Sequence, residues 1–272
     1  NKNDQIKFNE SVQIFNLAKS SGISLIDTAI SYGDSEKIIG RVGIKDFKFV
    51  TKLPALPEDV SDVNSWVEKK IQSSLTNIGT SSLYGILVHK SQNLLGNSGK
   101  KLIKALNNIK HKGFVSKIGV SIYSPTELDK VMDLTKLDII QAPLNIVDRR
   151  LEMSGWLKRL NNFGIEIHTR STFLQGLLLM DHTKIPKFFH KWRQMFDKWF
   201  LELEKNNLNP IHECLSYPLS LQEVSQIVVG VDSFKQLKDL IATSSLNESK
   251  KDWSFMISND QMLINPYNWK KL

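Results

Sequence analysis

The amino-acid sequence predicts an α/β fold of the (β/α)8 barrel type. Short apolar runs, which are typical of buried strands, alternate along the chain with longer segments whose apolar residues recur at helical spacing. No Pro-, Gly- or Ser-rich linker interrupts this alternation, which is typical of parallel strands joined by crossover helices. Polar residues follow several of the runs directly, and in a barrel those strand ends share the face on which active sites lie.

Helices and strands are predicted in turn along the chain. Phe8, Val12 and Phe15 recur at helical spacing and predict the first helix. The first predicted strand follows at residues 25–26. The other predicted strands are residues 47–52, 83–89, 117–121, 137–141, 165–171 and 227–230, with helical stripes between them. Residues 172–217 are predicted as a long irregular segment. Its Trp and Phe cluster at 188–200 is partly at helical spacing, and we interpret it as packing rather than as a ligand cage. The alternative for some of these residues is a place at the border of a pocket, because long loops often cover a barrel mouth.

Two features of this pattern separate the possible α/β folds. A doubly wound sheet is expected to have a glycine-rich phosphate loop after its first strand, and the sequence contains no G-x-G-x-x-G. The barrel is therefore favoured, but the pattern holds seven strands rather than eight. Seven strands would leave open edges, so we expect the natural protein to have a first barrel strand that this chain lacks.

The stretch from residue 24 to 40 has the character of an active-site rim. The run Leu25–Ile26 ends in the carboxylate of Asp27, and Tyr32 follows on the next loop. Asp34 is predicted to cap a new helix with its side chain, and Glu36 places an acidic group in the first turn of that helix.

The composition limits the class of protein. The formal charge is +8, but the lysines are scattered rather than grouped with aromatic residues, so we favour an anionic small molecule over nucleic acid as the partner. The single cysteine, the absence of a signal pattern and the short apolar runs predict a cytoplasmic protein without disulfides or membrane spans. No H-x-x-x-H spacing predicts a metal site, and no G-x-S-x-G predicts a hydrolase.

The pattern D-T-A-x-x-Y-G-x-S-E-x-x-I-G at residues 27–40 resembles the aldo-keto reductase family. Gly-Val-Ser at 119–121, Gln-Ala-Pro-Leu-Asn at 141–145 and Ser-Thr-Phe-Leu-Gln-Gly at 171–176 also resemble segments of that family. The resemblance implies a catalytic tetrad, whose matching residues here are Asp27, Tyr32, Lys52 and His89.

These residue types suit carbonyl reduction. Hydride transfer to a carbonyl carbon leaves an alkoxide that needs an acid, and a free tyrosine with a pKa of about 10 is a weak donor at neutral pH. We expect Lys52 to lower the pKa of Tyr32, and Asp27 to keep Lys52 charged and oriented. His89 would polarise or orient the substrate oxygen.

The resemblance also implies a nicotinamide dinucleotide cofactor. Its nicotinamide would meet Ser121, Gln141 and Arg170, the last standing where the family usually has a stacked tyrosine. The remaining implied cofactor contacts are Ser171, Phe173 and Gln175 along the pyrophosphate, and Gly230, Val231, Asp232, Ser233 and Gln236 at the adenosine end. NADP(H) is the family default, but the Lys-Ser pair and later Arg that suit a 2′-phosphate are absent here, so NAD(H) stays open.

The sequence therefore predicts one barrel domain over residues 1–272 that reduces a small aldehyde or ketone, such as a sugar-derived carbonyl, with NAD(P)H. The alternative is a barrel that binds the dinucleotide without catalysis and acts as a sensor or an assembly partner. Neither the substrate nor the oligomeric state can be read from the residues.

Overall fold

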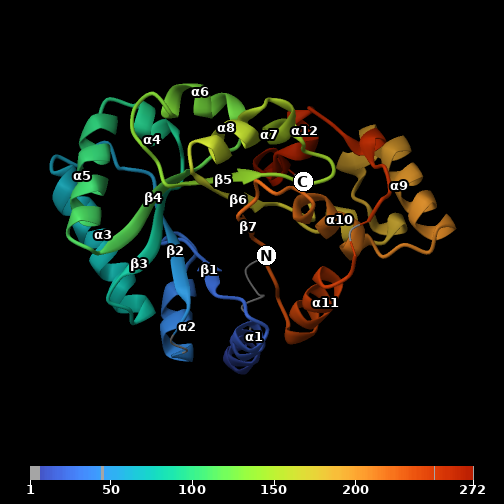
Figure 1. The fold of residues 1–272 in the computed structure, drawn as a ribbon, viewed down its shortest axis with the longest axis horizontal. Helices are drawn as coiled ribbons and strands as arrows, with labels where there is room; N and C mark the ends of the chain where they lie inside the picture. Colours follow the sequence, from blue (N-terminus) through green and yellow to red (C-terminus); the bar gives the residue numbers. More distant parts are fainter. Residues whose placement is uncertain (1–6, 44–45, 248, 272) are drawn as a thin grey trace. The chain divides into compact units, whose positions relative to one another are not determined.

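The computed structural model describes residues 7–43, 46–247 and 249–271 of the chain (Figure 1). The described residues form two compact units. The first is drawn from 1–122, 126–141 and 230–239, and the second from 123–125, 142–229 and 240–272. A single barrel domain over the whole chain stays a prediction.

Strands and helices alternate in the first unit. Its strands are β1 (Leu25–Asp27), β2 (Lys48–Leu53), β3 (Leu83–Val88), β4 (Val115–Ser121) and the start of β5 (Ile139–Pro143). Its helices are α1 (Phe8–Ser20), α2 (Ser35–Val42), α3 (Val63–Ile78), α4 (Gln92–Leu95), α5 (Gly99–His111), α6 (Leu128–Val131) and the beginning of α11 (Phe234–Ser244). In the described part of the chain no strand precedes α1.

All strand pairs in this unit are parallel and follow chain order. Asp27 is level with Val50, and Lys52 with Leu87. Ser121 is level with Gln141. This register brings the polar residues at the ends of these strands to one edge of the sheet, as the strand–helix alternation predicts.

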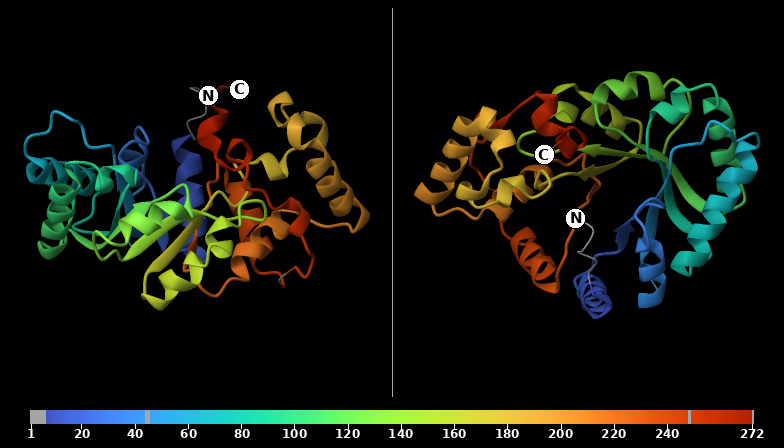
Figure 2. Two further views of the ribbon diagram at one scale, coloured as in Figure 1. Left: turned by 90° about the horizontal axis from the view of Figure 1, so that it is seen from above. Right: turned by 180° about the vertical axis from the view of Figure 1, so that it is seen from behind.

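The helices of this unit form a layer over the strands. α1 packs on α2, α2 on α3, and α3 on α5; the last two lie next to each other in both views of Figure 2. Their inward stripes include Val67 and Ile71, which are fully buried. No helix of the described part is long and apolar enough to cross a membrane.

α2 is held by a buried carboxylate. Glu36 is buried, and its Oε1 accepts hydrogen bonds from the hydroxyls of Thr51 (2.7 Å) and Ser74 (2.9 Å). Gly40 allows the close approach of α2 to α3, because a Cβ there would lie 2.0 Å from the carbonyl oxygen of Asn77. The predicted cap was wrong in its contact: Asp34 precedes α2, but its carboxylate accepts from Lys37 rather than from a backbone N–H.

We expect Glu36→Ala to destabilise the protein by about 2–4 kcal/mol, because two buried hydroxyls lose their acceptor. Glu36→Gln keeps one acceptor oxygen and should cost clearly less. Urea unfolding of both variants measures the difference. Equal loss in the two variants would contradict the role given to the acceptor oxygen.

The second unit contains the rest of β5 and α11, together with β6 (Glu166–Arg170) and β7 (Gln226–Ile227), which pair in parallel. Its other helices are α7 (Arg150–Met153), α8 (Trp156–Asn162), α9 (Arg193–Lys205), α10 (Pro210–Leu219) and α12 (Gln261–Ile264). Short 3₁₀ turns lie at Leu177–Leu179, His182–Lys184, Lys187–Trp192, Ser254–Met256 and Pro266–Lys271, and a further one, Pro125–Glu127, precedes α6.

Two predictions for this part of the chain were wrong. Residues 172–217 are largely helical rather than irregular, since they contain α9 and most of α10. The last strand covers Gln226–Ile227 instead of 227–230.

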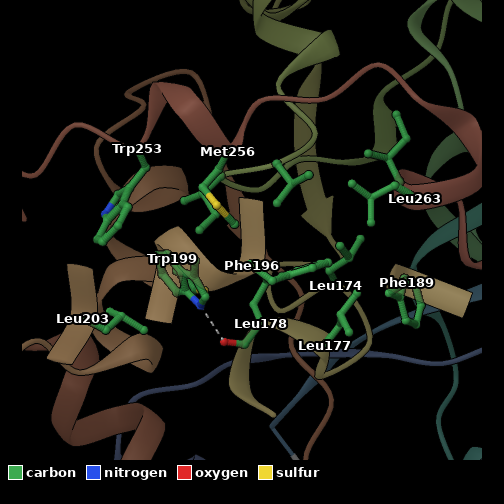
Figure 3. Close-up of a cluster of buried hydrophobic side chains, with 14 residues drawn as sticks. Leu174, Leu177, Leu178, Phe189, Phe196, Trp199, Leu203, Trp253, Met256 and Leu263 are labelled. Carbon is green, nitrogen blue, oxygen red and sulfur yellow. Dashed lines mark hydrogen bonds between the residues drawn. The ribbon is translucent and has the colours of Figure 1, made fainter. Parts of the chain in front are cut away.

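The aromatic residues of 188–200 form a core, as we interpreted them. Phe189, Phe196 and Trp199 are buried in one cluster with Trp253 and Met256 (Figure 3). The Trp199 and Trp253 rings lie 4.4 Å apart, centroid to centroid. The indole N–H of Trp199 donates to the carbonyl oxygen of Leu178 at 3.2 Å, which satisfies the polar atom of this buried ring.

Candidate active site

A buried ion pair lies at the ends of β1 and β2. The side chain of Lys52 is only 2% exposed, and its ammonium donates to Oδ2 of Asp27 and to the carbonyl oxygen of Thr28 at 2.9 Å. An ammonium group buried this deeply stays charged only when it is paired and hydrogen-bonded. Both conditions are met here.

Gln141 completes the surroundings of Asp27. Its Nε2 donates to Oδ1 of Asp27 at 2.7 Å, so Lys52 and Gln141 each bind one of the two carboxylate oxygens. Gln141 was predicted from the resemblance to bind a nicotinamide carboxamide. Its contact with Asp27 joins residues 114 positions apart, and no local pattern predicts it.

Tyr32 lies next to this ion pair, on a tight loop. The Tyr32 N–H donates to the carbonyl oxygen of Ala29 at 2.9 Å, and Gly33, with a φ of 57°, turns the chain into α2. The Lys52 ammonium nitrogen lies 5.3 Å from the centroid of the Tyr32 ring. The side chain of Tyr32 is half exposed, so an incoming ligand can reach it.

His89 follows β3 directly, and its N–H donates to the carbonyl oxygen of Leu53 at 3.2 Å. Its ring meets the Tyr32 ring edge to face, with centroids 6.0 Å apart and planes at 77°. Ser31 Oγ lies 3.4 Å from His89 Nδ1, a neighbour that the sequence did not suggest. The first unit thus brings Asp27, Tyr32, Lys52 and His89 together.

Other residues implied as cofactor contacts also lie in the first unit. Ser121 is buried at the end of β4. At the start of α11, Ser233 Oγ accepts from the Gln236 N–H at 3.2 Å. The Gln236 side-chain oxygen accepts in turn from the Asp232 N–H at 2.7 Å. Ser233 and Gln236 therefore form a local cap on α11, in the manner of a capping box.

The second unit contains the loop that follows β6. The Arg170 guanidinium carbon lies 4.6 Å from the centroid of the Tyr123 ring, a pairing that the sequence did not suggest. Ser171 and Gln175 both have positive φ, 64° and 55°. Left-handed backbone is uncommon for residues other than glycine and is often found at functional loops. The Asn145 side-chain N–H donates to the carbonyl oxygen of Ser171 at 2.9 Å and holds this loop.

The donor groups of this loop suit a dinucleotide. Residues 170–176 include a guanidinium, hydroxyls and an amide but no acidic side chain. Thr172 Oγ1 is buried and finds no hydrogen-bond partner among the described residues. A buried hydroxyl without a partner is unusual in a native protein and is explained when a bound group completes it. Phe173 packs partly buried against the aromatic cluster.

The described residues contain no group of three or more His, Cys, Asp or Glu side chains that could hold a metal ion. A tyrosine hydroxyl beside a buried Lys–Asp pair can donate a proton to a bound oxygen, and a neighbouring histidine can orient that oxygen.

Comparison with known proteins shows the family of this chain. A family model described as "Aldo/keto reductase family" matches residues 1–258. The chain belongs to the aldo/keto reductase family.

Two relatives illustrate how this family member compares with others. It is 25% identical over 210 residues to an aldo-keto reductase of Gibberella moniliformis, which covers 72% of this chain and 63% of that protein. It is 23% identical over 281 residues to an NADH-specific methylglyoxal reductase of Escherichia coli, which covers 88% of this chain and 84% of that protein. The chain thus spans slightly less than two thirds of the length of the Gibberella moniliformis protein.

The fold agrees with a solved structure. The holo form of an aldo-keto reductase from Bacillus halodurans superimposes with a TM-score of 0.76 at 18% identity, over 93% of this chain and 87% of the other. The predicted (β/α)8 barrel is therefore confirmed as the fold class, and no counterpart of its first strand is found in the described part of this chain.

Proposed function

We propose that this aldo/keto reductase reduces a small aldehyde or ketone to an alcohol with Tyr32 as the general acid. The observation that carries the proposal is the buried Lys52 ammonium, which is bonded to Asp27 and lies 5.3 Å from the centroid of the Tyr32 ring. A cation at this position stabilises the phenolate that remains after Tyr32 has given up its proton.

Each of the four residues has a distinct task in this proposal. Tyr32 donates its phenolic proton to the oxygen of the carbonyl as negative charge develops there. Lys52 stabilises the resulting phenolate, and Asp27 fixes the ammonium in place. His89, beside the Tyr32 ring, orients the carbonyl oxygen toward the hydroxyl.

The cofactor in this proposal is NADP(H) or NAD(H), which supplies the hydride when bound. In the first unit, Ser121 would hold the nicotinamide end, level with Gln141, which Asp27 fixes. The resemblance gives Arg170 of the second unit the same task. Residues 171–175 would follow the pyrophosphate, where the buried Thr172 hydroxyl finds a partner. NADP(H) is the family default, whereas the Escherichia coli relative is named as NADH-specific.

The proposed substrate is a short carbonyl compound, and the name of the same relative makes methylglyoxal the first compound to try. The proposed location is the cytoplasm, which is supported by a single cysteine, Cys214, that is buried.

Steady-state oxidation of NADH and NADPH with a panel of aldehydes, ketones and keto-sugars tests this function. We expect turnover with at least one carbonyl compound and one cofactor. The rival function, a barrel that binds the dinucleotide without reducing anything, predicts cofactor binding by calorimetry with no turnover on the whole panel. That second result would overturn the proposed function.

A further inference from the structure

The inference concerns which cofactor is preferred, and it rests on the proposed function. Residues 230–236, which form the implied adenosine end, follow the last strand and lead into α11. In (β/α)8 barrels the loops after the last strands and the N-terminus of a nearby helix commonly form a phosphate site. A phosphate on the ribose 2′-oxygen is what distinguishes NADPH from NADH.

A carboxylate from the other end of the chain already lies at this helix terminus. Glu10 Oε1, in the first turn of α1, accepts a hydrogen bond at 2.6 Å from the backbone N–H of Phe234, the first residue of α11. Both residues belong to the first unit, where α1 and α11 occupy the lower part of Figure 1. This backbone N–H is therefore not available to a phosphate.

Other polar groups at this helix terminus are also hydrogen-bonded within the protein. The hydroxyl of Ser233 and the side-chain oxygen of Gln236 are bonded within the cap of α11. The charged side chains of residues 230–239 are Asp232, Asp239, Lys235 and Lys238. With Glu10, these residues provide three carboxylates and two ammonium groups. The carboxylate of Glu10 is the one that is hydrogen-bonded to the start of the helix.

We propose that Glu10 is a specificity-determining residue that disfavours the 2′-phosphate and makes this enzyme prefer NADH to NADPH. A 2′-phosphate carries a charge of about −1.5 to −2 at neutral pH. Near the protein surface, like charges at about 5 Å repel strongly enough to change affinity several-fold to about a hundredfold. NADH lacks this phosphate and does not meet the repulsion.

The variant Glu10→Gln tests the proposal because it removes the charge and keeps an oxygen that can accept from the Phe234 N–H. Calorimetry gives the dissociation constants of NADH and NADPH, and of 5′-AMP and 2′,5′-ADP, which differ only in the 2′-phosphate. We expect the wild type to prefer NADH, and Glu10→Gln to tighten NADPH and 2′,5′-ADP about tenfold with little change for NADH and 5′-AMP. Glu204→Gln, which removes an exposed carboxylate on α9, should leave all four constants unchanged.

The wild type alone provides a second measurement that does not depend on how a variant folds. Raising the ionic strength screens the repulsion, so the ratio of NADPH to NADH affinity should rise with salt. A ratio that falls with salt would show that a cationic clamp dominates and would overturn the proposal.

The remaining outcomes separate this inference from the function on which it rests. If both cofactors bind and their ratio is the same in Glu10→Gln as in the wild type, the role of Glu10 is wrong and the reductase function stands. If neither cofactor binds, the reductase function is wrong and the role of Glu10 fails with it.

Discussion

Tyr32→Phe should lower the rate of carbonyl reduction by about 100- to 10,000-fold and leave cofactor binding intact. The substitution removes only the hydroxyl, so the ring keeps its edge-to-face contact with His89 and its position near the Lys52 ammonium. Steady-state kinetics and calorimetric titration of the cofactor measure the two quantities separately.

The wild type should also lose reductase activity as the pH rises and the Tyr32 phenol loses its proton. The variant lacks this proton, so its residual activity should be insensitive to pH over the same range. Tyr267→Phe is a matched control, because it removes the same hydroxyl from an exposed ring near the end of the chain. Near wild-type turnover of Tyr32→Phe would show that another group is the acid, and His89 is the next candidate.

Lys52→Met should reduce both turnover and stability. The Tyr32 phenolate loses its stabilising cation, and the carboxylate of Asp27, with a side chain only 11% exposed, loses its cationic partner. Removing one partner of a buried ion pair typically costs about 3–5 kcal/mol. Gln141 still donates to Asp27 Oδ1, which favours the lower end of that range.

The double variant Asp27→Asn/Lys52→Met separates the two effects of Lys52. It removes both charges, so it should regain much of the stability that Lys52→Met loses while turnover stays low. The kinetic effects of Tyr32→Phe and Lys52→Met should be far from additive, because the two residues act as one unit. Additive kinetic effects, or a double variant that regains turnover, would contradict this division of roles.

The fold was readable from the sequence wherever a local pattern was strong. Apolar runs such as 83–89 predicted the strands of the first unit. Apolar residues at helical spacing, such as those of α3, predicted its helices. The prediction failed at residues 172–217, because only part of the cluster at 188–200 shows helical spacing and many other aromatic and basic residues surround it. Proline often breaks a helix, yet Pro218 lies inside the last turn of α10.

Positions in the candidate site could be predicted where a residue stands at a strand end. Asp27, Lys52 and His89 lie at or next to the ends of β1, β2 and β3 because parallel strands in register present their ends at one edge. The contacts that join distant parts of the chain were not readable. Gln141 with Asp27 and Glu10 with Phe234 depend on the folded placement of each residue, which no local pattern encodes.

Transfer of deuterium from a cofactor deuterated at the reduced nicotinamide carbon tests the central claim most directly. The protein is incubated with NADH or NADPH that bears deuterium in place of both hydrogens of this carbon, together with methylglyoxal or another carbonyl compound of the panel, and the product is examined by mass spectrometry. The account predicts an alcohol with deuterium on the former carbonyl carbon, formed by the wild type and nearly absent with Tyr32→Phe. An alcohol without deuterium, no alcohol with any carbonyl compound, or equal yields from the wild type and Tyr32→Phe would contradict it.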